Sequence, residues 1–183
     1  MNIVEAQRDV RTVFLGGFAG QLVSGVLWLL SAGLATFYTT NSAILVLLLG
    51  GIFIFPLTQL TLRLMGQRAS LGKDHPMNQL AMQVAFTLPL NLLIVLAATL
   101  YRLNWFYPAF MIALGAHYLP FVFLYGMRQF AVLAAVLVGA GVIIGMYFSA
   151  VFSLGGWFTG AVLLIFAFVG RSAVLRESRT VHN

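Results

Sequence analysis

The chain has 183 residues, of which 61% are hydrophobic and only 8% are charged. Soluble proteins contain roughly 25% charged residues, so this chain has too few charges to cover the surface of a soluble domain. The composition excludes an ordinary cytosolic enzyme and a disordered chain, and the net charge of +6 does not point to nucleic acid as a partner, because the basic residues are spread thinly between apolar segments.

Six apolar runs predict an integral membrane protein of the all-α class, because about 20 apolar residues in a helix cross the hydrocarbon core of a bilayer. The runs do not alternate between apolar and polar residues, as the strands of a β-barrel would. Short connections at 39–42, 102–104 and 151–153 predict three antiparallel hairpins in a single transmembrane domain. The six predicted spans are residues 13–38, 43–65, 79–101, 105–127, 130–150 and 154–170.

The basic residues indicate an orientation, because Lys and Arg of short loops are retained on the cytoplasmic side. With the N-terminus inside, nine of the ten basic residues fall in inner segments, and Arg102 alone falls in an outer turn. We therefore expect both termini and the longest loop, 66–78, on the cytoplasmic side of a bacterial inner membrane. The basic inner face would lie against anionic lipid headgroups, with docking of an acidic partner as the alternative.

Polar side chains are costly in hydrocarbon unless they have a partner or line a cavity. In the first four predicted spans they lie between the membrane centre and the inner surface, whereas the last two spans have almost none. We therefore predict a cytoplasm-facing cavity between the first four spans, with hydrogen bonding between helices as the alternative. The predicted ligand-binding residues are His117, Asn91, Gln83, Gln59, Thr87, Gln21, Arg63 and Tyr125.

His117 is, apart from the tyrosines, the only ionisable side chain predicted near the bilayer centre. An intramembrane histidine can relay protons or bind a ligand. It can equally be a neutral group that hydrogen-bonds to Asn91 or to a backbone carbonyl. Pro56, Pro89 and Pro120 lie at similar depths, and each frees a backbone carbonyl within its helix. We expect the resulting kinks to converge near Asn91 and His117.

Several kinds of chemistry are absent from the sequence. The chain has no cysteine, and no Asp or Glu lies inside a predicted span. These absences argue against a carboxylate-driven antiporter, an intramembrane aspartyl protease and a Cys-ligated metal site. We therefore expect no metal or other cofactor and assign no catalytic residue. A lipid-modifying enzyme that uses His117 remains an alternative.

Small residues at intervals of four predict close helix packing in the first, fifth and sixth spans. In the first span they are Gly16, Gly20 and Ser24. With the length and the six spans, this stripe resembles the substrate-binding subunits of energy-coupling-factor vitamin transporters, which dock a partner through small residues of their first helix. The resemblance implies a substrate-binding subunit of a larger transporter, although the short turn at 39–42 departs from that pattern.

The sequence leaves two main hypotheses. The first is a small membrane protein that binds or transports a small polar or amphipathic molecule through the predicted cavity. The second is a non-catalytic accessory or scaffold subunit, whose small-residue faces in the first, fifth and sixth spans pack against a second copy or a partner subunit.

Overall fold

The computed structural model describes residues 1–181 as α-helices joined by short connections, with no strand in that range. Six helical stretches are long and apolar enough to cross a membrane, which confirms the predicted all-α bundle. The elements in chain order are α1 (Ile3–Val13), η1 (Leu15–Gly17), α2 (Phe18–Phe37), α3 (Thr40–Leu64), α4 (Asn78–Tyr101), η2 (Leu103–Trp105), α5 (Phe106–Tyr125), α6 (Gln129–Tyr147) and α7 (Leu154–Val181).

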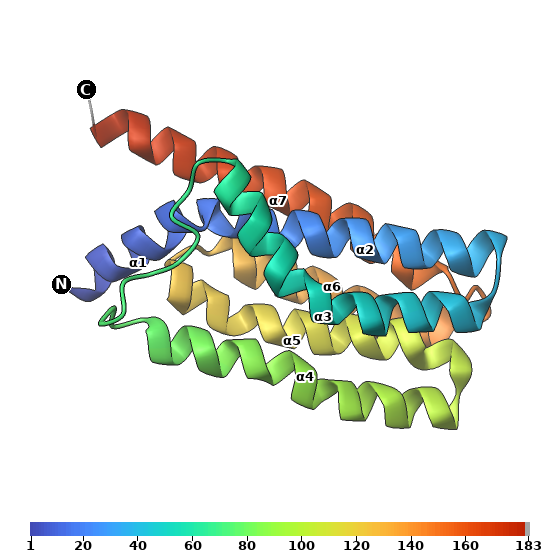
Figure 1. Ribbon diagram of the computed structural model, residues 1–183. Coiled ribbons are helices and arrows are strands. Elements are labelled where there is room, and N and C mark those ends of the chain that lie inside the picture. Colours follow the sequence, from blue (N-terminus) through green and yellow to red (C-terminus); the bar gives the residue numbers. More distant parts are fainter. Residues whose placement is uncertain (182–183) are drawn as a thin grey trace.

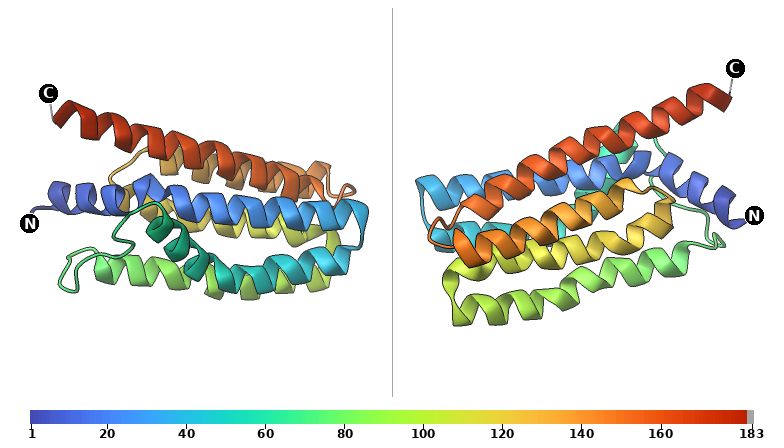
Figure 2. Two further views of the ribbon diagram at one scale, coloured as in Figure 1. Left: turned by 45° about the horizontal axis from the view of Figure 1, so that its top comes forward. Right: turned by 180° about the vertical axis from the view of Figure 1, so that it is seen from behind.

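The long helices run roughly along one direction (Figure 1). α2 packs against both α3 and α7, and α5 packs against both α4 and α6. The N-terminus, the end of α7 and the segment between α3 and α4 lie at one end of the bundle (Figures 1 and 2). We call this the terminal end. The tight turns after α2, α4 and α6 lie at the opposite end.

Glycines let the central helices approach closely. A Cβ atom placed on Gly160 of α7 would lie 3.1 Å from the backbone oxygen of Gly25 in α2. A Cβ atom on Gly141 of α6 would lie 2.9 Å from the backbone oxygen of Pro108 in α5. These small residues therefore serve packing within the chain, whereas Gly139 of α6 has no atom within 4 Å of such a Cβ.

The predicted first span is not one continuous helix. The chain breaks at η1, where Leu15, Gly16 and Gly17 have φ angles of 48°, 64° and 84°, and α2 begins only at Phe18. The expected stripe of Gly16, Gly20 and Ser24 on one helix face is therefore wrong, because Gly16 precedes the helix. A Cβ atom on Gly16 would lie 2.7 Å from the backbone oxygen of Gly170, so only glycine fits both the conformation and the contact with α7.

A short amphipathic helix, α1, precedes this break and is absent from the predicted elements. A capping box fixes its start: the Glu5 amide donates to Asn2 Oδ1 at 2.9 Å, and the Asn2 amide donates to Glu5 Oε2 at 3.0 Å. One face of α1 is buried through Ala6, Val10 and Val13. Its apolar face thus docks on the bundle at the terminal end.

The last helix is longer than the predicted span, which ended at residue 170. α7 continues to Val181, and Glu177 in this extension accepts hydrogen bonds from α1. Arg11 donates to its two carboxylate oxygens at 2.7 and 2.6 Å, and Arg8 donates at 3.1 Å. This fork geometry is the stronger form of a carboxylate–guanidinium pair, and it joins the first helix to the last.

α3 and α4 form the outer part of the bundle. In their most apolar stretches only 11% of residues are buried, against 44% in α2 and α5. α3 packs on α2 and α4 packs on α5, but the two hardly contact each other. α3 contains Pro56, and its second half bends away from α4 (Figure 1). Both helices line a pocket that lies between them and the central helices α2 and α5.

Candidate ligand pocket

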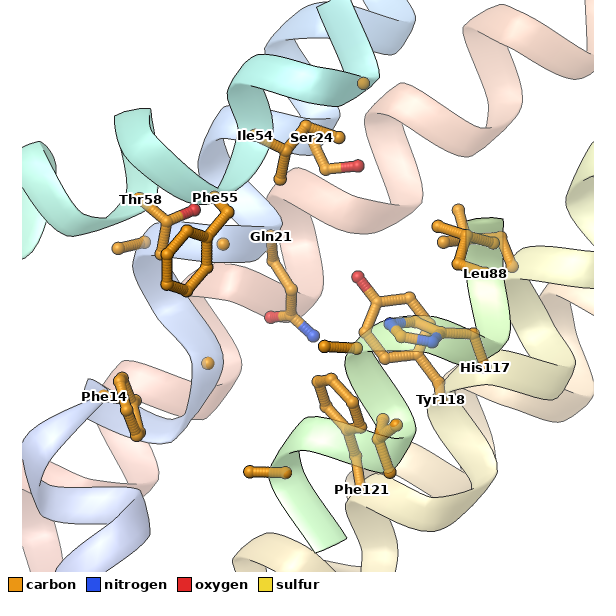
Figure 3. A pocket seen from close by; sticks show the side chains of 18 of the residues that line it. Phe14, Gln21, Ser24, Ile54, Phe55, Thr58, Leu88, His117, Tyr118 and Phe121 are labelled. Atoms are coloured by element: carbon orange, nitrogen blue, oxygen red, sulfur yellow. The ribbon is translucent and has the colours of Figure 1, made fainter. Parts of the chain in front are cut away.

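A pocket of about 620 Å³ lies between α2, α3, α4 and α5 (Figure 3). Its volume is within the range of roughly 300–1,000 Å³ that is typical of small-molecule sites. Leucine, isoleucine, alanine and phenylalanine side chains make up most of its wall. At the terminal end the lining includes Val10 of α1, Phe14 and Leu71. Apolar side chains therefore form most of the pocket wall, including its part at the terminal end.

Gln21 is the most unusual polar residue of this lining. It comes from the first turn of α2 and is 2% exposed. Neither Oε1 nor Nε2 has a hydrogen-bond partner among the residues that the structure describes. Figure 3 shows its amide extending from α2 toward Tyr118 and His117 of α5. A buried polar group without a partner costs about 1–3 kcal/mol, so the fold retains an amide that a bound molecule or water would satisfy.

Two tyrosines of α5 face the pocket from a cluster of aromatic rings. Tyr118 is 5% exposed and Tyr125 is 7% exposed. Phe121 lies between them, with ring centroids 5.3 Å from Tyr118 and 5.4 Å from Tyr125, and Phe130 of α6 supports Tyr125 at 4.9 Å. In Figure 3 the Tyr118 hydroxyl points into the space beside Gln21. These ring contacts hold the Tyr118 hydroxyl in position to bond to a ligand.

His117 lines the same pocket, and a neighbouring helix orients its ring. His117 Nδ1 lies 2.9 Å from Thr87 Oγ1 of α4, and the Thr87 hydroxyl donates to the Val84 carbonyl oxygen at 2.7 Å. With the single hydroxyl hydrogen of Thr87 directed at the Val84 carbonyl, Nδ1 is the donor toward Thr87. The neutral ring then presents Nε2 as an acceptor. The side-chain partner is thus Thr87 and not Asn91. The backbone of Val84 also hydrogen-bonds to the ring, in line with the alternative of a backbone carbonyl.

The remaining polar lining consists of Ser24 of α2 with Thr58 and Gln59 of α3. None of the described lining residues is Asp, Glu, Lys or Arg. Hydrogen-bonding capacity is therefore supplied by amides, hydroxyls and one imidazole, all without formal charge when the imidazole is neutral. In residues 1–181 no group of three or more His, Asp or Glu side chains is placed to hold a metal ion.

The structure distributes the eight predicted ligand-binding residues over three kinds of position. Thr87 does not line the pocket but orients His117. Asn91 is half-buried and outside the lining, and Gln83 and Arg63 are exposed near the ends of α4 and α3. The four predicted residues that line the pocket are Gln21, Gln59, His117 and Tyr125.

Three polar lining residues are missing from the predicted set: Ser24, Thr58 and Tyr118. A signal for Tyr118 is present in the sequence. Tyr118, Phe121 and Tyr125 are spaced by three and four residues, which places them on one face of a helix. The predicted set includes Gln83, Thr87 and Asn91 of α4 instead, and none of these three lines the pocket.

A comparison with family models places the chain in a family. The model of a family of unknown function (DUF7010) matches residues 3–171, so the chain belongs to this family. The match runs from α1 into α7 and includes every helix that lines the pocket. No curated protein matches the chain, and no solved structure matches it.

Proposed function

We propose that this member of the DUF7010 family binds a small amphipathic molecule in the pocket between α2, α3, α4 and α5. The observation that carries the proposal is Gln21, an amide that is 2% exposed and has no partner among the described residues. A site that only packs helices together would favour an apolar residue here, because a buried unsatisfied amide destabilises the fold. A ligand with a hydrogen-bonding group accounts for its presence.

The lining suggests how such a molecule is held. Gln21 can donate through Nε2 and accept through Oε1, and His117 can accept through Nε2. The Tyr118 hydroxyl, beside Gln21 in Figure 3, can do either. The apolar part of the ligand would contact the leucine and phenylalanine side chains that form most of the wall. One end of the ligand is thus bonded and the other end is only packed.

Binding is the part of the function that the geometry supports. Transport would require the pocket to open toward both sides of the membrane. At the terminal end, however, the apolar residues Val10, Phe14 and Leu71 line the pocket, and nothing in their placement favours an opening there. The accessory-subunit alternative draws no support from the glycines of α6 and α7 that contact α5 and α2, since those contacts are internal. For the enzyme alternative, the described lining residues offer no acid–base group besides His117 other than tyrosines.

Binding can be measured through Trp28, which lines the pocket and is 1% exposed. The other two tryptophans are replaced in a Trp105→Phe/Trp157→Phe background, and the protein is placed in lipid nanodiscs. Three probes are added, each with a bromine at the end of its chain: 11-bromo-1-undecanol, 11-bromoundecanoate and 11-bromoundecyl-trimethylammonium. Bromine quenches tryptophan only on close contact, so quenching of Trp28 reports a molecule inside the pocket.

We expect at least one probe to quench Trp28 saturably. Gln21→Met in the same background should weaken that probe, because Met keeps the length of the side chain but cannot hydrogen-bond. Gln83→Met is the matched control, since Gln83 is exposed and does not line the pocket. The proposed function is wrong if none of the three probes quenches Trp28 saturably, or if both substitutions change the affinity equally.

A further inference from the structure

The pocket has a mouth between α3 and α4. Four residues both line the pocket and are exposed on the outer surface, and they are divided between these two helices. Ile52 and Phe55 of α3 are 70% and 71% exposed, and Ala85 and Pro89 of α4 are also exposed. The two helices hardly contact each other, and Figure 1 shows the second half of α3 bending away from α4. We call these four residues the α3–α4 mouth.

This mouth faces the hydrocarbon core of a bilayer. Ile52 and Phe55 lie near the middle of α3, and Ala85 and Pro89 lie in the first half of α4. Both helices are candidate membrane spans, so the middle of each lies at hydrocarbon depth. All four side chains are apolar, and a water-soluble molecule would gain nothing from them. A molecule dissolved in the bilayer would meet a continuous apolar path instead.

The depth of the polar groups sets the orientation of such a molecule. Gln21 is 2% exposed and Tyr118 is 5% exposed, so both are buried, in contrast to the four exposed residues of the α3–α4 mouth. A polar head would therefore bind at the inner end of the pocket, with the chain extending toward Ile52 and Phe55.

The absence of charge from the described lining limits the head group. A carboxylate, a phosphate or a quaternary ammonium would be buried beside Gln21 without a counter-ion, and an unpaired buried charge is strongly unfavourable. A neutral head that both donates and accepts satisfies Gln21 on both of its polar atoms. An alcohol is the simplest group with this property.

We propose that the pocket takes an uncharged single-chain amphiphile directly from the bilayer through the α3–α4 mouth, with its neutral hydrogen-bonding head against Gln21. This inference rests on the proposed function. It adds the chemical class of the ligand and the route by which the ligand arrives, and each of these has a separate test.

The first test compares heads on equal chains, with the same Trp28 assay. Concentrations are expressed as moles of probe per mole of lipid in the bilayer. On this scale 11-bromo-1-undecanol should half-saturate Trp28 quenching at a concentration more than about tenfold lower than either charged probe. Equal affinity for the alcohol and a charged probe overturns the assigned head group. Such a result would leave the proposed function standing, because saturable quenching would still show binding in the pocket.

The second test addresses the route, by measuring the rate of Trp28 quenching after mixing with nanodiscs that contain 11-bromo-1-undecanol. Ala85→Phe should slow quenching several-fold, because the larger ring narrows the mouth. Ala97→Phe is the matched control: Ala97 is also exposed on α4 but does not line the pocket. Both positions are exposed, so neither substitution disturbs buried packing.

A water-soluble quencher completes the test of the route. Acrylamide added from water should leave Trp28 almost unquenched, since an apolar mouth at hydrocarbon depth admits no aqueous solute. Strong quenching by acrylamide, or equal rates for Ala85→Phe and Ala97→Phe, overturns access through the α3–α4 mouth. In either case saturable quenching by the bromoalcohol keeps the proposed function intact, so the two failures can be told apart.

Discussion

Gln21 combines two properties that seldom occur together in a residue kept only for stability. Its side chain is buried in the first turn of α2, and both of its polar atoms lack partners among the described residues. In the Ser31–Tyr107 pair, by contrast, the fold satisfies its buried hydroxyls: these oxygens lie 2.6 Å apart, and Ser31 also donates to the Ala43 carbonyl oxygen at 2.8 Å. This pair satisfies its buried hydroxyls, whereas Thr159 Oγ1 of α7 is buried without a partner in residues 1–181, as Gln21 is, but outside the pocket lining.

This contrast predicts the effect of Gln21→Met on stability. Without ligand, the substitution should raise the midpoint of thermal unfolding, because it removes an unsatisfied amide that costs about 1–3 kcal/mol. Ser31→Ala should lower the midpoint by breaking a satisfied pair. Differential scanning fluorimetry on protein in nanodiscs measures both. A lower midpoint for Gln21→Met would show that Gln21 has a structural partner and would remove the main support for a ligand.

A second prediction at this scale concerns the protonation of His117. The contact with Thr87 places the proton of the neutral ring on Nδ1. Imidazole ¹⁵N chemical shifts of protein labelled at histidine should therefore show an Nδ1–H tautomer, assigned by its loss in His117→Asn. Thr87→Val should shift the population toward the Nε2–H tautomer. An Nε2–H signal in the unmodified protein would contradict the arrangement and the acceptor role of Nε2.

At the scale of elements, the closeness of α5 and α6 depends on individual glycines. A Cβ atom on Gly141 would lie 2.9 Å from the Pro108 backbone oxygen, which cannot move without shifting α5. Gly141→Ala should therefore destabilise the protein by about 1–3 kcal/mol. Gly139→Ala on the same helix meets no atom within 4 Å and should be neutral or slightly stabilising. Thermal unfolding midpoints that move equally for the two variants would contradict this packing.

The elements that the sequence predicted well are those that hydropathy defines. Six candidate spans appear because long apolar helices are the dominant signal in a membrane chain. The break at η1 escaped the same signal, because Leu15, Gly16 and Gly17 are apolar or small and leave hydropathy high. Only the adjacent glycines marked it. The end of α7 was missed for the opposite reason, since residues 171–181 are too polar to be a span and yet remain helical.

The pocket was less predictable than the spans, because hydropathy does not fix the rotation of a helix. The sequence predicts Gln83 and Arg63 as ligand-binding residues, but both are exposed. Each lies near an end of its helix on the side of the terminal end, where a long polar side chain can reach headgroups and water. Gln21 lies in the first turn of α2 and His117 near the middle of α5. Both helices pack on several neighbours, so these two side chains face the interior whatever their distance from the helix ends.

At the scale of the whole molecule, the arrangement of the ends predicts which segments share a side of the membrane. The segment between α3 and α4 lies at the terminal end, and the turn after α4 lies at the opposite end (Figure 1). Because the chain has no cysteine, Lys73→Cys and Asn104→Cys each introduce a unique thiol. In sealed vesicles an impermeant maleimide should label the two from opposite sides. Labelling from the same side would refute the six-span arrangement.

The contact between η1 and α7 also has a consequence for biosynthesis. α2 is the first candidate span to leave the ribosome, and its main neighbours are α3 and the last helix, α7. Gly16 meets Gly170, and Arg11 meets Glu177. α2 must therefore remain in the bilayer with one flank bare while four more spans are made. Its interior face completes its packing only when the chain is almost finished, so a nascent chain stalled before α7 would leave the N-terminal spans as substrates for membrane quality control.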